Sequence, residues 1–171
     1  MVTQNALIFS LFLKSIMKNT FNKGVNWGII GVGDVCEVKS APAMNLVKGS
    51  KLVAVMRRNA EKAADFAQRH GVPKWYSDAD TLINDPNVNA IYIATPPDTH
   101  AFYTLKAAAA GKPVYVEKPM ARTHQECLDM VAACAKADVP LFVAYYRREL
   151  EIYKTVKRLI TEGVIGDIRF V

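Results

Sequence analysis

Two closely spaced glycines carry the first chemical signal in the sequence. Gly31 and Gly33 follow a short apolar run, and Cys36 fills the third small position of a G-x-G-x-x-small pattern. Gly31 permits a sharp turn out of a strand, and Gly33, which has no Cβ, lets a pyrophosphate approach the backbone. A helix beginning with Asp34 and Val35 would direct unpaired N–H groups at that phosphate. The pattern predicts a dinucleotide site, although other strand–helix turns share it.

Two arginines follow the next apolar run, residues 52–56. In NAD sites an acidic side chain near this point, about 20 residues after the glycines, accepts hydrogen bonds from the ribose 2′-hydroxyl. Arg57 and Arg58 stand there instead. A guanidinium binds the 2′-phosphate of NADP in bidentate fashion. The pair therefore predicts NADP as the cofactor, with NAD as the alternative. The competing interpretation is two ordinary surface charges.

Two further segments carry residues of chemical interest. Thr95 and Pro96 follow the apolar run 90–94, and the residue before a proline avoids the helical region, so we expect an extended segment against the cofactor. His100 follows within the next helix as a weaker candidate, because a lone histidine is more often structural. Its position nevertheless places it close to the end of the apolar run 90–94, where Thr95 and Pro96 lie.

Glu117 and Lys118 follow the apolar run 114–116 directly. A lysine taken out of water at a strand end can donate to a substrate hydroxyl or carbonyl and exchange its proton, so Lys118 is the candidate catalytic residue. Glu117 can hold that lysine or contact the nicotinamide ribose. The alternative is a surface ion pair ahead of a turn.

Short apolar runs alternate with helical segments along most of the chain. The predicted strands are 27–30, 52–56, 74–76, 90–94, 114–116 and 141–145, and the predicted helices are 34–47, 60–70, 77–83, 98–110, 123–137 and 148–162. This alternation predicts an α/β fold with a doubly wound parallel sheet and right-handed crossovers. Ligands of such sheets bind beyond the carboxyl ends of the strands, where all the segments above lie.

Composition narrows the class of protein. With 171 residues, of which 51% are hydrophobic and 22% charged, the chain can bury a core. The formal net charge is +6, but the basic residues are scattered without an aromatic-interleaved patch, which argues against nucleic acid. The three cysteines lack metal-ligand spacing and are odd in number, so we expect no metal, no disulfide framework and a cytoplasmic location.

The chain divides into three parts. Residues 1–24 form an extension whose apolar run, 6–13, is too short for a bilayer span of about 20 residues, so no membrane association is expected. The extension is a leader, a loosely docked helix or, as we favour, an upstream segment before a true start at Met17. Residues 25–147 form the dinucleotide-binding domain. Residues 148–171 form a linking helix and the first strand, 166–171, of a second domain.

Taken together, these motifs resemble the Gfo/Idh/MocA oxidoreductase family. The matching segments are 28–34, 94–96 with His100, 111–114, 117–119, 146–148 and 166–168. The resemblance implies a Rossmann domain, followed by a truncated α+β domain, in an NAD(P)-dependent dehydrogenase or reductase of a sugar, polyol or related hydroxyl compound. It also implies that Lys118 contacts substrate and that Arg147 approaches the nicotinamide.

Two departures from the family pattern matter. Arg57 replaces a frequent acidic residue, as in NADP-preferring members, and the chain stops where the second domain's sheet should begin. In the family that domain supplies most of the substrate pocket and the usual homo-oligomer interface. We therefore expect NADP binding with little or no turnover by this chain alone. The alternative is a non-catalytic NADP-binding or partner-binding fragment, and a nucleic-acid role is weaker still.

Overall fold

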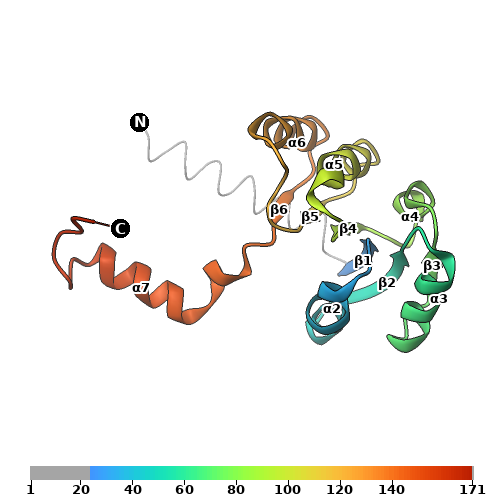
Figure 1. Ribbon diagram of the computed structural model, residues 1–171, viewed down its shortest axis with the longest axis horizontal. Helices are drawn as coiled ribbons and strands as arrows, with labels where there is room; N and C mark the ends of the chain where they lie inside the picture. The colour runs from blue at the N-terminus through green and yellow to red at the C-terminus, as the bar shows by residue number, and fades with distance from the viewer. Residues whose placement is uncertain (1–23, 171) are drawn as a thin grey trace.

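The computed structural model describes residues 24–170, which form one six-stranded parallel sheet with helices on both faces (Figure 1). The strand order is β3-β2-β1-β4-β5-β6, and every neighbouring pair is parallel. This order has its switch point between β1 and β4, and it confirms the predicted doubly wound parallel sheet. The predictions for the extension before Gly24 fall outside the described residues.

The strands agree closely with the apolar runs. They are β1 Val25–Ile30, β2 Ser50–Met56, β3 Lys74–Tyr76, β4 Ala90–Ile93, β5 Val114–Val116 and β6 Leu141–Val143. The helical segments are η1 Cys36–Ser40, α2 Ala41–Leu46, α3 Ala60–Arg69, α4 Ala79–Asn84, η2 Pro97–Thr99, α5 His100–Ala109, α6 His124–Lys136, η3 Tyr146–Glu149 and α7 Glu151–Thr161. Among these residues, no helix is long and apolar enough to cross a bilayer.

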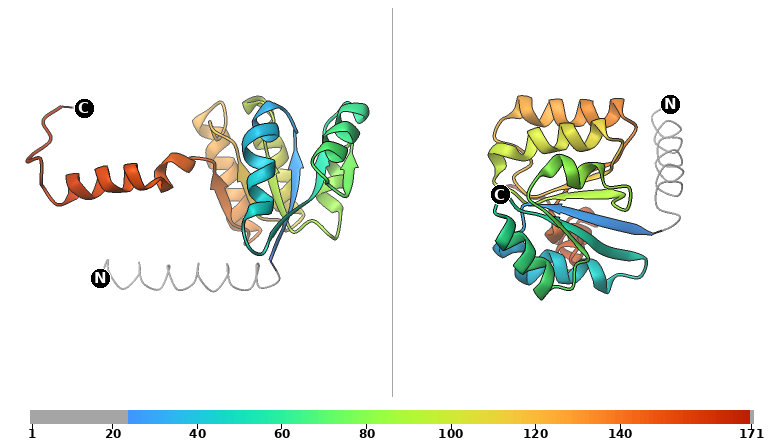
Figure 2. Two further views of the ribbon diagram at one scale, coloured as in Figure 1. Left: turned by 90° about the horizontal axis from the view of Figure 1, so that it is seen from below. Right: turned by 90° about the vertical axis from the view of Figure 1, so that its right-hand side faces the viewer.

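The sheet is buried on both faces, which explains why its central strands are continuously apolar. Successive residues point to opposite faces, so Ile29 packs with η1, α2 and α3, whereas Ile30 packs with α4, α5 and α6. Figure 2 shows α5 and α6 on one side of the strands and α2 and α3 on the other. The helices begin where capping predicts: Asn59 caps α3, and Thr123 with Glu126 forms a capping box on α6.

The helix after the glycines has a wide turn in its middle. It begins at Asp34, passes through the π-helical segment η1 and continues as α2. In the wide turn the Ala41 N–H donates to the carbonyl of Cys36, five residues back. Pro42 follows in the first turn of α2, and a proline has no N–H and crowds the carbonyl four residues back. The wide turn accommodates the proline one turn earlier than Pro42 itself.

The end of the chain differs from the prediction. The described residues after α7, Gly166–Phe170, form no strand. Figure 2 shows α7 and these residues extending away from the sheet, so none of the described strands lies beside them to pair with their N–H and C=O groups. The large apolar side chains of α7 are correspondingly exposed, namely Ile152, Tyr153, Val156 and Ile160.

Candidate functional site

The carboxyl ends of four neighbouring strands meet at one edge of the sheet. β1 lies between β2 and β4, and β5 follows β4. Backbone hydrogen bonds continue the ladders just past the strand ends: the N–H of Gly31 donates to Met56 O, that of Ala94 to Ile30 O and that of Glu117 to Ile93 O, each at 2.9 Å. The segments predicted to do chemistry therefore leave the sheet side by side.

The two glycines of the turn are required for different reasons. Gly31 has φ of +92°, and a Cβ there would lie 2.6 Å from Cγ2 of Thr95, so this residue must be glycine for the turn to pack against the β4 loop. A Cβ at Gly33 would meet no described atom within 4 Å. Gly33 thus faces open space, which a phosphate needs in order to approach the backbone closely. The turn fits a dinucleotide pyrophosphate.

The start of the helix offers hydrogen-bond donors to that space. The N–H groups of Cys36 and Glu37 donate to Gly33 O at 2.9 and 3.1 Å. In the described part of the chain, the N–H groups of Asp34 and Val35 donate to no acceptor outside the helix. Both residues are exposed. First-turn N–H groups have no partner within a helix, so these two are available to an anion.

Cys36, the third small position of the glycine pattern, is a core residue. Its side chain is completely buried, and its Sγ lies 3.9 Å from Gly31 O beneath the turn. Burial raises the pKa of this thiol to about 12. The side chain is therefore a compact filler under the turn and not a nucleophile.

The arginines lie beside the glycine turn at the end of β2. The N–H of Arg57 donates to Tyr76 O at 3.1 Å, which fixes its backbone to β3. Arg57 is partly exposed and Arg58 is exposed, and within residues 24–170 neither joins an ion pair. Two arginines without an ion-pair partner among residues 24–170 thus lie at the strand end next to the glycine turn, and a guanidinium group can bind an anion.

The side chain of His100 holds the loop after β4 in place. Pro96 is extended, with φ −59° and ψ 149°, as its sequence predicts. Nε2 of His100 lies 2.7 Å from Thr95 O, and Nδ1 lies 3.0 Å from Pro119 O. The ring is completely buried. The structure therefore corrects the prediction of His100 as a cofactor contact, because its ring braces two loops and presents no surface to the crevice.

Glu117 and Lys118 differ in how they are held. Glu117 is partly buried; its Oε1 accepts a 2.6 Å hydrogen bond from Tyr92 OH, and its Oε2 accepts one of 3.1 Å from the Lys118 N–H. Lys118 itself is exposed. The desolvation that its prediction invoked is therefore not provided by the described residues. Lys118 has no side-chain ion pair with Glu117 in this part of the chain, so the surface ion-pair interpretation is also not observed.

Arg147 is the most distant of the predicted residues. It lies in η3, just after β6, and is exposed. β6 is separated from β1 by β4 and β5, which amounts to roughly 14 Å at the usual strand spacing. The structure brings Gly31, Thr95 and Glu117 together and leaves Arg147 at the far margin of the same edge.

Sequence reasoning missed two residues beneath the site. Tyr92, from the middle of β4, is 1% exposed, and its hydroxyl lies 2.9 Å from Ser40 Oγ as well as against Glu117. The available signal was a tyrosine within an otherwise aliphatic buried strand, because a buried hydroxyl needs a partner. Sequence reasoning also gave His70 no role, yet its Nε2 lies 2.7 Å from Glu37 and joins α3 to the glycine-turn helix.

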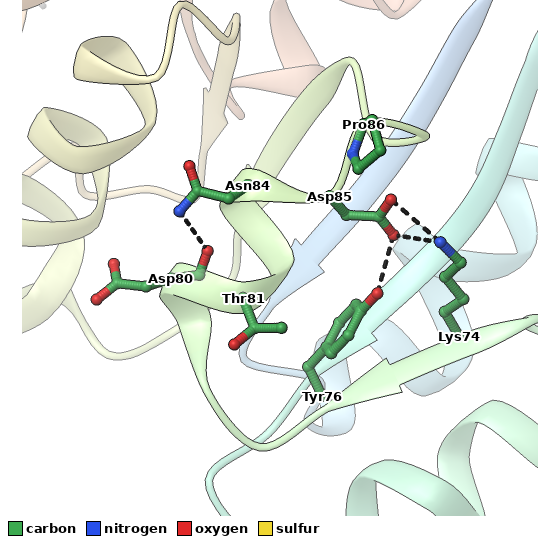
Figure 3. Close-up of a pocket in the computed structure, with 7 residues that line it drawn as sticks. All are labelled: Lys74, Tyr76, Asp80, Thr81, Asn84, Asp85 and Pro86. Atoms are coloured by element: carbon green, nitrogen blue, oxygen red, sulfur yellow. Dashed lines mark hydrogen bonds and ion pairs between the residues drawn. The ribbon is translucent and has the colours of Figure 1, made fainter.

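A second polar hollow lies beside β3 and α4, at the β3 edge of the sheet. Figure 3 shows Asp85 accepting hydrogen bonds from Lys74 Nζ and Tyr76 OH there, at 2.9 Å each. The side chain of Asp85 is only 2% exposed. Across residues 24–170, no group of three or more His, Cys, Asp or Glu side chains is arranged to hold a metal ion. The hollow is lined by groups already bonded to one another.

The sheet order, glycine turn and strand-end loops are those of a dinucleotide-binding Rossmann domain. Residues 25–145 match the Gfo/Idh/MocA family, described as an oxidoreductase family with an NAD-binding Rossmann fold. The chain belongs to this family. The resemblance inferred from the motifs is thereby confirmed.

Relatives among characterised proteins agree with this membership. An oxidoreductase of Formosa agariphila is 50% identical over 144 residues, which is 84% of this chain and 45% of that protein. A 1,5-anhydro-D-fructose reductase of Ensifer adhaerens is 33% identical over 82% of this chain and 42% of its own length. The mouse trans-1,2-dihydrobenzene-1,2-diol dehydrogenase is 34% identical over 85% and 44%. The chain thus spans a little under half the length of these relatives.

Solved structures give the same result. A 3-ketoreductase from Actinomadura kijaniata in complex with NADP has a TM-score of 0.80 at 25% identity, over 85% of this chain and 46% of that one. An oxidoreductase from Agrobacterium radiobacter in complex with NAD⁺ has a TM-score of 0.77 at 29% identity, over 84% and 42%. Both nicotinamide cofactors therefore occur among structures similar to this chain.

Proposed function

We propose that this chain supplies the cofactor-binding half of an NADP-dependent oxidoreductase that acts by hydride transfer on a sugar, polyol or related hydroxyl compound. The observation that carries the proposal is the position of Arg57: it follows Met56 at the end of β2, the N–H groups of Gly31 and Val32 donate to Met56 O, and Arg57 joins no ion pair among residues 24–170. A dinucleotide lying across that turn brings its adenosine ribose to the end of β2. Arg57 is then the group that binds the 2′-phosphate, and Arg58 adds charge beside it.

The crevice continues from the turn toward β4 and β5. In this proposal Thr95 and Pro96 line the middle of the cofactor, and Glu117 and Lys118 face its nicotinamide end. The bound nicotinamide would supply hydride exchange with a hydroxyl or carbonyl carbon. Lys118 Nζ, exposed at that end, would donate to the substrate oxygen and exchange its proton. The names of the similar proteins, a reductase of an anhydro-sugar and a dehydrogenase of a diol, support this substrate class.

The substrate half of the reaction needs more than these residues. Hydride transfer requires the substrate to be held in near-attack geometry over the nicotinamide. Lys118 alone on an exposed edge does not provide that geometry. We therefore expect the 171 residues tested alone to bind NADP(H) with little or no turnover, and a robust rate on any sugar or polyol would contradict this. The three free cysteines, two of them buried, support a reducing compartment such as the cytoplasm.

The cofactor choice is tested by titrating NADPH and NADH into the unmodified chain and into Arg57→Asp. We expect NADPH to bind the unmodified chain at least about tenfold tighter than NADH, and Arg57→Asp to remove that preference because a carboxylate repels the 2′-phosphate. Lys51→Asp is the matched control: it makes the same change of charge on the same strand, at an exposed position near the opposite end. Tighter binding of NADH to the unmodified chain would overturn the assignment of Arg57.

A further inference from the structure

A chain of hydrogen bonds crosses the interior directly beneath the crevice. Ser40 Oγ lies 2.9 Å from Tyr92 OH, which lies 2.6 Å from Glu117 Oε1, while Glu117 Oε2 accepts from the Lys118 N–H at 3.1 Å. Tyr92 is the only one of the four that is fully enclosed, at 1% exposure. A hydrogen-bonded hydroxyl in such surroundings holds its partners more firmly than one in water.

The direction of these hydrogen bonds follows from the groups involved. Burial, and then the hydrogen bond to Glu117, raise the pKa of Tyr92 far above its usual value, so its hydroxyl keeps its proton. A carboxylate only accepts, so the Tyr92 hydroxyl donates to Glu117. Its single proton is then engaged, and the Ser40 hydroxyl must donate to the Tyr92 oxygen. The chain runs from Ser40 through Tyr92 to Glu117.

The two ends of this chain belong to different halves of the predicted cofactor site. Ser40 is the last residue of η1, the wide turn of the helix that begins at the glycine turn. Glu117 and Lys118 leave the end of β5, on the other side of β4. Tyr92 lies between them on β4 and stacks on the ring of Tyr115 with centroids 5.3 Å apart. It therefore connects the helix of the glycine turn to the Glu117 carboxylate after β5.

We propose that Tyr92 is a positioning residue, which fixes the Glu117 carboxylate, and through it the Lys118 backbone, at the nicotinamide end of the crevice. The inference rests on the proposed function, because it assumes a dinucleotide with its 2′-phosphate ribose near Arg57. Tyr92 does not touch the cofactor, since its ring is buried in the sheet. Its effect is transmitted through Glu117.

The test compares Tyr92→Phe with Tyr115→Phe. Both substitutions remove one hydroxyl from neighbouring strands on the same face and leave the stacked rings in place, but Tyr115 makes no side-chain hydrogen bond within residues 24–170. Dissociation constants are measured for NADPH and for adenosine 2′,5′-bisphosphate, which contains the 2′-phosphate half and lacks nicotinamide. We expect Tyr92→Phe to weaken NADPH binding by about fivefold to tenfold and to change bisphosphate binding by less than about twofold. Tyr115→Phe should leave both nearly unchanged.

Two further variants separate positioning from general stability. In a Glu117→Ala background, Tyr92→Phe should cause no additional loss of NADPH affinity, because the residue through which Tyr92 acts is gone. Ser40→Ala should weaken NADPH binding in the same direction by about twofold. Circular dichroism of each variant establishes that it is folded.

The outcomes are distinguishable. If Tyr92→Phe weakened the binding of NADPH and of the bisphosphate equally, its role would be structural only and the inference would be overturned. A full additional loss of NADPH affinity in the Glu117→Ala background would overturn it too. A Tyr92→Phe variant that binds like Tyr115→Phe would overturn it as well. If the unmodified chain bound neither NADPH nor NADH, the proposed function itself would fail.

Discussion

The two ends of the sheet use their charged side chains in opposite ways. At the amino end, Asp85 accepts hydrogen bonds from Lys74, from Tyr76 and from both nitrogens of Asn87 at 2.9–3.1 Å. At the carboxyl end, neither Arg57 nor Lys118 belongs to an ion pair within residues 24–170. The charged side chains at the amino end are therefore engaged in contacts that hold β3, α4 and β4 together. At the carboxyl end, the side chains of Arg57 and Lys118 are available to a ligand.

This difference shows which of two polar hollows is a site. The hollow around Asp85 has a volume of about 510 Å³, and charged and polar residues line it, as they line many binding pockets (Figure 3). Its carboxylate, however, already has four donors. The carboxyl end instead offers N–H groups of Asp34 and Val35 without an acceptor outside their helix, an open glycine backbone at Gly33, and Arg57 and Arg58, which join no ion pair among residues 24–170. Available hydrogen-bonding capacity, and not concavity, identifies the candidate site.

The largest expected effect comes from disrupting the amino-end cluster, which consists of Lys74, Tyr76, Asp85 and Asn87. Asp85→Ala removes the acceptor of four donors and should lower the free energy of unfolding by about 3 kcal/mol, measured by urea denaturation. NADPH affinity of the folded variant should change by less than about twofold, because the Asp85 carboxylate is hydrogen-bonded to none of the predicted cofactor residues. Asp80→Ala serves as the control: its ion pair with Lys106 is exposed, and it should cost no more than about 0.5 kcal/mol. A large loss of affinity in Asp85→Ala would mean that the two ends are coupled.

The carboxyl end should behave in the converse way. Gly33→Ala places a methyl group where no described atom lies within 4 Å, so the free energy of unfolding should stay within about 0.5 kcal/mol. The methyl group would occupy the space of the pyrophosphate, and NADPH affinity should fall by about tenfold or more. Gly31→Ala is the contrasting variant, since φ of +92° and the 2.6 Å approach to Thr95 predict a loss of stability as well. Unchanged affinity in Gly33→Ala would exclude the turn as the phosphate site.

The sequence predicted the fold well, for identifiable physical reasons. Strands buried on both faces must be apolar, so β2 and β4 stood out as runs, and capping residues such as Asn59 marked helix starts. The predicted strand 166–171 was wrong for Gly166–Phe170, because a strand exists only beside a partner that sequence alone does not place.

The site was predicted less completely than the fold. The sequence predicted that candidate residues at strand ends lie along one edge, because a parallel sheet brings those ends together, and the structure places Arg57 and Glu117 at this edge. The Ser40–Tyr92–Glu117 connection was missed because it joins side chains far apart in sequence, and no spacing rule relates them. His100 was placed near the correct loop, but its burial depends on two carbonyl oxygens of distant segments.

The smallest effect concerns pH and sharpens the comparison between the two ends. Burial alone would raise the pKa of the Asp85 carboxyl, but hydrogen bonds from Lys74, Asn87 and Tyr76 outweigh it and hold that pKa well below its usual range. A carboxyl whose pKa is lower in the folded state stabilises the fold above its unfolded pKa of about 4, and this contribution is lost as the pH falls further. In Asp85→Asn the contribution is absent at every pH. Between pH 5 and pH 3 the unmodified chain should therefore lose on the order of 1 kcal/mol more unfolding free energy than Asp85→Asn, measured by urea denaturation at each pH. The cofactor-end variant Gly33→Ala should follow the unmodified chain over the same range, and parallel curves for Asp85→Asn and the unmodified chain would show that the amino-end cluster is not held by this charge.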